Sequence, residues 1–188
     1  METTEPLGAA APVAGPGPLG HLAAVLIAVL GGALGILGAF IEEVRSGGFI
    51  LLPFIGAPVI EEMLKPLGLY LLLARWPRLL LGQLHTAVLS ALAGLTFGVI
   101  EALVYVNVYV SDPPDWFVAY RFSLPLLLHT TASFIVGLGV SPGLLAWASR
   151  GEPFPRASRN FYIAGIALHA LFNITATALA LAGVLDVD

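Results

Sequence analysis

Residues 49–74 read FILLPFIGAPVIEEMLKPLGLYLLLA, and this stretch decides the fold. It is longer than the ~20 apolar residues with which a helix crosses a bilayer. Its centre nevertheless holds Glu61, Glu62 and Lys65. Charged side chains at that depth cost about 3 kcal/mol each on membrane-insertion scales, so they need partners on other helices or a wet cavity. The stretch therefore predicts a buried polar site inside a membrane protein.

The composition of the whole chain agrees with this prediction. Of its 188 residues, 58% are hydrophobic and only 11% are charged, whereas about a quarter of a soluble domain is charged. The chain has no cysteine, which excludes disulfides and thiol catalysis. Its formal charge of −4 includes no basic run, so we expect no nucleic-acid partner. The expected surroundings are a lipid bilayer.

The apolar pattern predicts an all-α integral membrane protein, a polytopic bundle of about five transmembrane helices. The predicted spans are approximately residues 19–41, 49–74, 84–106, 120–148 and 160–184. Pro58 and Pro66 each free a backbone carbonyl, so the second span should be bent or broken, and Pro142 should kink or end the fourth. We expect residues 1–18, rich in Pro, Gly and Ala, to be a disordered tail, and 19–185 to form one transmembrane domain.

Basic residues in the connectors predict the orientation. The connectors at 42–48 and 107–119 hold only Arg45, whereas those at 75–83 and 149–159 hold five arginines: Arg75, Arg78, Arg150, Arg156 and Arg159. The arginine-rich connectors should be cytoplasmic. We therefore expect a multi-pass protein of the cell membrane with a cytoplasmic N-terminus.

Three further spans carry polar residues at a comparable depth. Glu101 lies in the third span, His129 in the fourth, and His169 and Asn173 one helical turn apart in the fifth. At ~1.5 Å per residue, most of them fall in the outer half of the bilayer. We expect them to meet Glu61 in an active site among spans two to five, toward the extracytoplasmic side. Purely structural polar contacts between helices are the alternative.

Two common hydrolase motifs do not account for the polar residues of these spans. The segment Gly139–Gly143 fits GxSxG, but that motif works on a strand-to-helix turn, and here it ends a membrane helix far from His169. No HExxH zinc signature is present. Neither motif predicts the chemistry of this chain.

The polar residues together resemble the PrsW branch of the CPBP superfamily (CAAX proteases and bacteriocin-processing enzymes), which contains glutamic intramembrane proteases. The pattern runs from residue 58 to about 176: Glu61-Glu62-x-x-Lys65, Phe97-x-x-x-Glu101, His129 and His169-x-x-x-Asn173. CAAX-type relatives have a basic residue one position later and a histidine in place of Glu101. The chain follows PrsW at both places, so prenyl-protein processing is not expected.

The resemblance implies a role for each matched residue. Glu61 and His169 would activate water without a metal or other cofactor, with Glu62 and Lys65 orienting them. Asn173 matches the oxyanion asparagine, and His129 is a stand-in for the second oxyanion donor because Glu101 occupies its usual motif. The implied substrate is a membrane-anchored protein. In PrsW-type proteins it is an anti-sigma factor, cut first on its extracytoplasmic side.

Two different functions remain open on the same residues. Glu61, Glu101, His129 and His169 are also residue types that bind zinc, which would make the chain a metalloprotease. Buried Glu, Lys and His also form proton relays, so a proton-coupled carrier or a non-enzymatic scaffold is the other alternative.

Overall fold

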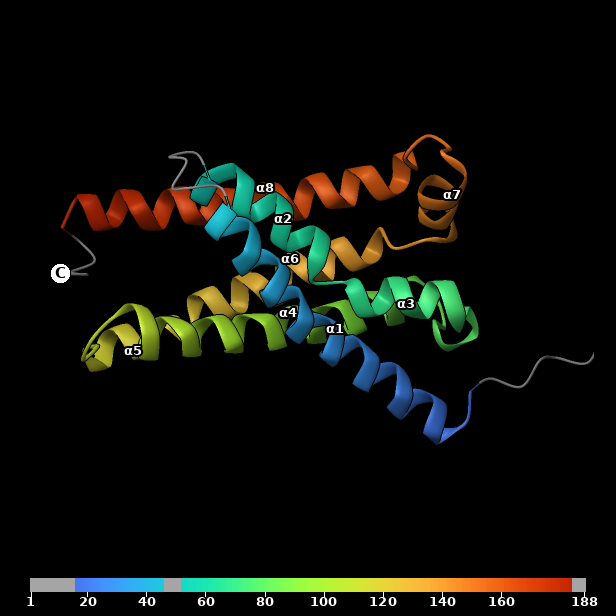
Figure 1. The fold of residues 1–188 in the computed structure, drawn as a ribbon, viewed down its shortest axis with the longest axis horizontal. Coiled ribbons are helices and arrows are strands. Elements are labelled where there is room, and N and C mark those ends of the chain that lie inside the picture. Colours follow the sequence, from blue (N-terminus) through green and yellow to red (C-terminus); the bar gives the residue numbers. More distant parts are fainter. Residues whose placement is uncertain (1–15, 46–51, 184–188) are drawn as a thin grey trace, which may run out of the picture.

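The computed structural model describes residues 16–45 and 52–183, and these parts of the chain contain helices and no strands (Figure 1). Four of their helical segments are long and apolar enough to cross a membrane: Pro18–Ile41, Gln83–Tyr109, Asp115–Leu138 and Arg156–Leu181. The prediction of an all-α polytopic membrane protein is confirmed. Most of the predicted tail, and the acidic end of the chain, lie outside the described residues.

The second predicted span is not one helix but three short ones. It consists of the π-helix η1 (Leu52–Gly56), α2 (Ala57–Leu64) and α3 (Leu67–Arg75). Pro58 sits at the start of α2, where its missing N–H costs nothing. Pro66, with φ −80° and ψ 20°, separates α2 from α3. The predicted break is therefore present, and it lies about one helical turn after Glu61 and Glu62.

The fourth predicted span differs from the structure at both ends. It begins earlier, with α5 (Asp115–Arg121), continues as α6 (Leu124–Leu138) and stops well before residue 148. The short helix α7 (Pro142–Arg150) follows as a separate element. The backbone leaves the helix at Gly139, and Pro142 cannot donate the hydrogen bond that would continue it.

The remaining spans lie close to their predicted positions. They are α1 (Pro18–Arg45), α4 (Gln83–Val104) with the π-helical turn η3 (Tyr105–Tyr109), and α8 (Arg156–Leu181). A 3₁₀ turn, η2 (Pro77–Leu79), connects α3 to α4.

Small residues let these helices approach one another closely. A Cβ added at Gly31 of α1 would overlap the backbone of Gly68 in α3. One added at Gly94 of α4 would overlap the carbonyl oxygen of His129 and the side chain of Ser133 in α6. Membrane helices commonly pack through such residues. This contact holds the two helices that carry Glu101 and His129 side by side.

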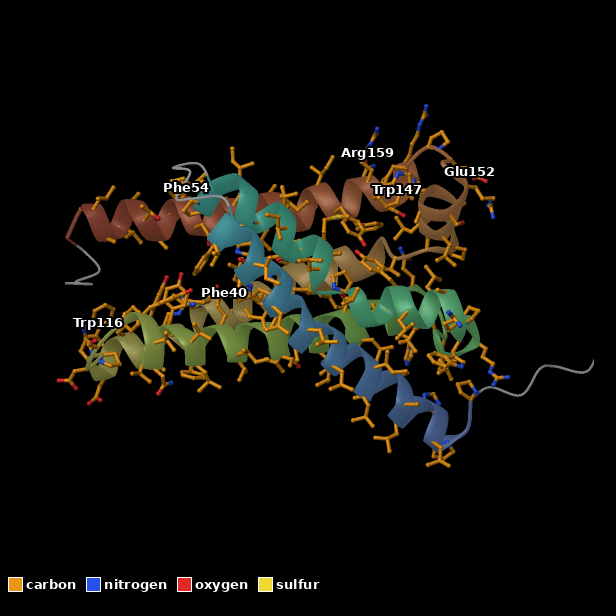
Figure 2. All side chains as sticks on the ribbon, viewed as in Figure 1. Phe40, Phe54, Trp116, Trp147, Glu152 and Arg159 are labelled. Atoms are coloured by element: carbon orange, nitrogen blue, oxygen red, sulfur yellow. The ribbon has the colours of Figure 1, made fainter. Side chains whose placement is uncertain are left out.

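The apolar core and the polar residues lie toward different ends of the bundle. The start of α1, α7 and the start of α8 lie at one end, and α5 and the last turns of α8 at the other (Figure 1). Figure 2 shows Trp147, Glu152 and Arg159 at the first end and Trp116 at the second. The apolar core, which includes Leu72, Leu89 and Val136, fills the half nearer the first end. The polar residues lie between this core and the second end.

Candidate active site

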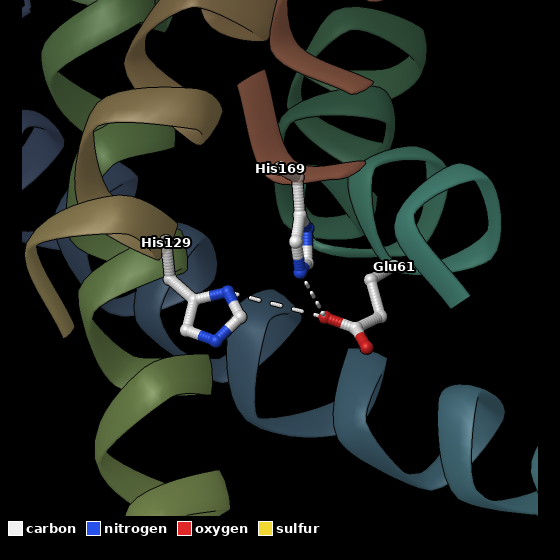
Figure 3. A group of neighbouring side chains, drawn as sticks. All are labelled: Glu61, His129 and His169. Carbon is white, nitrogen blue, oxygen red and sulfur yellow. Dashed lines mark ion pairs between the residues drawn. The ribbon is translucent and has the colours of Figure 1, made fainter. Parts of the chain in front are cut away.

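Four helices bring the predicted site residues together. Glu61 and Glu62 come from α2, with Lys65 directly after it, and Glu101 from α4, His129 from α6, and His169 with Asn173 from α8. The close-up in Figure 3 shows the side chains of Glu61, His129 and His169 pointing toward one another. Residues separated by more than 100 positions thus share one site, as their depths predicted.

Glu62 is the fully buried anchor of the site. Its Oε1 accepts a hydrogen bond from Lys65 Nζ at 2.6 Å and lies 2.9 Å from His169 Nδ1. Ser133 Oγ lies 3.5 Å from the other carboxylate oxygen. If the carboxylate is ionised, His169 Nδ1 must carry the hydrogen, which leaves the lone pair on its Nε2.

Glu61 is held less tightly than Glu62. Its Oε2 is buried and has no hydrogen-bond partner among the described residues. The nearest polar atoms are Lys65 Nζ at 3.3 Å, His169 Nε2 at 3.8 Å and His129 Nδ1 at 3.9 Å. The ammonium forms an ion pair with this oxygen without the alignment of a hydrogen bond. A carboxylate oxygen with unused acceptor capacity therefore faces two imidazole rings.

His129 connects the lysine to Glu101. Its Nδ1 lies 2.7 Å from Lys65 Nζ, and its Nε2 lies 2.7 Å from Glu101 Oε2. Because an ammonium only donates, Nδ1 accepts and Nε2 carries the hydrogen donated to Glu101. Both ring nitrogens are thus engaged, so His129 has no N–H for the predicted second oxyanion contact in this arrangement.

Phe97 and Asn173 complete the predicted set. The Phe97 ring packs against His129 with centroids 5.4 Å apart, and Lys65 Nζ lies 4.5 Å above it. The Asn173 amide donates one hydrogen bond to the carbonyl oxygen of Pro53 at 2.8 Å. An amide nitrogen carries two N–H donors, so this contact fixes the group and uses one of them.

Arg121 and Ser133 belong to the site although sequence reasoning did not select them. Arg121 Nη2 donates to Glu101 Oε2 at 2.9 Å. Arg121 lies near the start of the fourth predicted span, where a charge inside an apolar stretch could have identified it. Ser133 lies one helical turn after His129 and shares its face, a spacing that could have identified it.

A cavity of about 630 Å³ opens beside these residues. It extends from the site toward the end of the bundle where α5 lies. Apolar side chains form much of its wall, and Glu61, Glu101, Arg121, His129, His169 and Asn173 also line it. Such a cavity can admit water and part of a polypeptide to the charged cluster.

The GxSxG segment lies away from this site. Ser141 Oγ is 3.1 Å from Ser158 Oγ, and both line a second pocket beside α7, at the opposite end of the bundle. The segment is therefore far from His169, as its position at the end of a membrane helix predicted.

Three of the site residues also have the geometry of a candidate metal cluster. One donor atom each from Glu61, His129 and His169 lies within 4.8 Å of the other two. Glu101, predicted as a further zinc ligand, instead contacts His129 Nε2, on the far side of that ring. The arrangement thus offers both a possible water-activating pair and a possible three-residue metal site.

Comparison with known proteins gives the family. A search of curated proteins returned no match, and a search of solved structures returned none either. The model of a protein family described as PrsW family intramembrane metalloprotease matches residues 14–187. The match covers nearly the whole chain, including every residue of the site above, and the chain therefore belongs to the PrsW family of intramembrane proteases.

Proposed function

We propose that this peptidase hydrolyses peptide bonds of membrane-anchored proteins with a water molecule activated by Glu61 and His169, without a bound metal. The observation that carries the proposal is Glu61 Oε2, which is buried without a hydrogen-bond partner among the described residues and faces His169 Nε2 at 3.8 Å, and both residues line the cavity. The same features support placing this chain among the glutamic proteases of the CPBP superfamily.

The proposed reaction begins with a water that enters the cavity and donates to Glu61 and to His169 Nε2. Glu61 takes the proton as general base while the water oxygen attacks the scissile carbonyl carbon. The tetrahedral intermediate collapses when the C–N bond breaks, and Glu61 returns the proton to the leaving nitrogen. The products are a new carboxyl terminus and a new amino terminus.

Glu62 and Lys65 position this pair. Glu62 holds His169 Nδ1 at 2.9 Å, which directs the Nε2 lone pair toward Glu61. The Lys65 ammonium stands 3.3 Å from Glu61 and 2.6 Å from Glu62. Its positive charge attracts both carboxylate groups and so helps to hold them beside His169.

Asn173 is the proposed oxyanion donor. Its amide lines the cavity and is held in place by the carbonyl of Pro53. A side-chain donor of this kind is worth ~3 kcal/mol to the transition state in other hydrolases. We assign no oxyanion contact to His129, because Lys65 and Glu101 engage both of its nitrogens.

A metal-dependent protease is the second candidate function. It is favoured by the convergence of Glu61, His129 and His169 and by the description of the family. Each histidine also has its other ring nitrogen on a carboxylate, as metal-binding histidines commonly do.

The position of Lys65 argues against a metal. Its Nζ lies 2.7 Å from His129 Nδ1 and 3.3 Å from Glu61 Oε2, and these are two of the three atoms that would hold the ion. A divalent cation there would stand against an ammonium group. With Lys65 in place the residues do not fit a metal ion, so no step of the proposed reaction uses one.

The distribution of apolar side chains disfavours a proton-coupled carrier. The cavity opens toward one end of the bundle, and the apolar core occupies the half toward the other end. A carrier needs access from both sides of its central site. A site that is accessible from one end suits a hydrolase.

We further propose that the cavity faces the extracytoplasmic side of the cell membrane, where a PrsW-type protein would cut a membrane-anchored anti-sigma factor. The orientation rests on the five arginines of the connectors at the other end.

Single substitutions test the proposed roles. Glu61→Gln and His169→Gln should each abolish cleavage of a membrane-anchored model substrate by detergent-purified protein, because each removes a proton acceptor of the water. Asn173→Ala should lower kcat about 100-fold. Ser141→Ala is the matched control and should cleave at the wild-type rate. Full activity in Glu61→Gln would contradict the proposal.

A further inference from the structure

Arg121 is a buried cation on the wall of the cavity that the proposed reaction does not use. Its side chain is 12% exposed, and its Nη2 donates to Glu101 Oε2 at 2.9 Å. The guanidinium carbon lies 3.7 Å from the centre of the Tyr105 ring. These contacts hold the guanidinium between Glu101 and the Tyr105 ring.

The protein leaves part of this guanidinium unsatisfied. Arginine has five N–H donors, and the Nε of Arg121 is buried without a hydrogen-bond partner among the side chains and backbone that the structure describes. Unpartnered buried donors are rare in folded proteins. The side chain is 12% exposed and lines the cavity, so the exposed part of the guanidinium can donate from its terminal N–H groups to a bound substrate.

The charges of the site indicate which acceptor this is. Lys65 and Arg121 supply two positive charges, and three carboxylates face them: Glu61, Glu62 and Glu101. With ionised carboxylates and neutral histidines, the cluster already carries an excess negative charge. An acidic side chain would add another, whereas a peptide carbonyl is a neutral acceptor that every substrate carries.

We propose that Arg121 is a substrate-binding residue that donates hydrogen bonds to a backbone carbonyl of the bound polypeptide. This inference rests on the proposed peptidase function. His129 and Glu101 separate Arg121 from Glu61, and an extended peptide advances ~3.3 Å per residue. The bound carbonyl therefore belongs to a residue a few positions from the scissile bond, where it sets the register of the substrate.

Binding to an uncleaving enzyme tests this subsite. The probe is a fluorescent synthetic transmembrane peptide with a juxtamembrane segment, and the host is detergent-purified Glu61→Gln protein, which keeps the peptide intact. Adding Arg121→Lys retains the positive charge beside Glu101 but removes Nε–H and the planar fork. Kd should rise about tenfold, as expected for a lost hydrogen bond to a charged group. Arg159→Lys, at an exposed arginine near the other end, is the matched control and should leave Kd unchanged.

Backbone esters locate the contact and separate binding from a loss of folding. Replacing one amide by an ester weakens that carbonyl as an acceptor. In the Glu61→Gln protein, an ester at one position should raise Kd. In the Glu61→Gln/Arg121→Lys protein, the same ester should have no further effect, because the contact is already lost. A purely structural role of Arg121 would not give this dependence of one change on the other. Equal Kd values with and without Arg121→Lys would contradict the proposed subsite. So would effects of the ester and of Arg121→Lys on Kd that are independent of each other at every ester position. Arg121-dependent binding of a peptide that wild-type protein does not cleave would support the subsite and contradict the proposed peptidase mechanism.

Discussion

At the scale of single residues, Lys65 is the centre of the site. Its ammonium has three donors, and three acceptors surround it: Glu62 Oε1 at 2.6 Å, His129 Nδ1 at 2.7 Å and Glu61 Oε2 at 3.3 Å. The group is fully buried, so its charge is tolerated only because these partners replace water. The lysine thereby makes His129 Nδ1 a hydrogen-bond acceptor and forms ion pairs with both glutamates.

Removing this ammonium should destabilise the protein strongly. Lys65→Met leaves Glu62 buried beside an uncharged side chain, and breaking a buried pair costs about 3–5 kcal/mol. Unfolding in detergent with increasing SDS measures the loss. The control is Arg150→Met, which breaks an ion pair with Glu152 whose side chains are 65% and 51% exposed and should cost less than about 1 kcal/mol. Equal losses in the two variants would contradict the account of Lys65.

At the scale of helices, the contact between α4 and α6 determines where Glu101 and His129 meet. Gly94 lies against the backbone of His129 itself, so the position of His129 depends on the absence of a side chain at residue 94. Packing at this point therefore controls the geometry of the candidate site.

A single methyl group at this contact should separate the helices. In Gly94→Ala the new Cβ would overlap the carbonyl of His129, and relieving such a clash costs about 1–3 kcal/mol. We expect lower thermal stability and a kcat reduced at least tenfold. Gly17→Ala, where an added Cβ meets nothing within 4 Å, is the control and should change neither measurement. Wild-type kcat in Gly94→Ala would show that α4 and α6 tolerate the methyl group.

Sequence reasoning reached the spans and most of the site because both depend on local signals. Apolar length identifies a membrane helix, and a charge inside it must find a partner. The partners themselves depend on how helices rotate and tilt, which spacing does not fix. The pairing of Lys65 with His129 and the inclusion of Arg121 therefore emerged only from the structure. The early end of the fourth span also has a local signal, because Pro142 predicted a kink or an end there and the helix stops at Leu138.

At the scale of the whole molecule, the apolar core and the cavity occupy opposite halves of the bundle. The core holds the helices together near α7, and the other half accommodates the cavity. Function then depends on which end faces outward, because the substrate must reach the cavity from that side.

Cysteine labelling tests the orientation directly, since the chain has no cysteine of its own. Ser111 and Ser149 are exposed residues near opposite ends of the bundle. In intact cells a membrane-impermeant maleimide should label Ser111→Cys and should label Ser149→Cys only after lysis. The reverse pattern would place the cavity on the cytoplasmic side.

The central claim is that Glu61 and His169 activate water beside an ammonium group rather than a metal ion. The most direct measurement is the cleavage rate of a membrane-anchored model substrate by purified protein whose metal content has been determined before and after chelation. We predict an unchanged rate in protein that holds far less than one metal ion per chain. Activity that disappears with the metal and returns when zinc is added would contradict the claim and establish the metalloprotease instead.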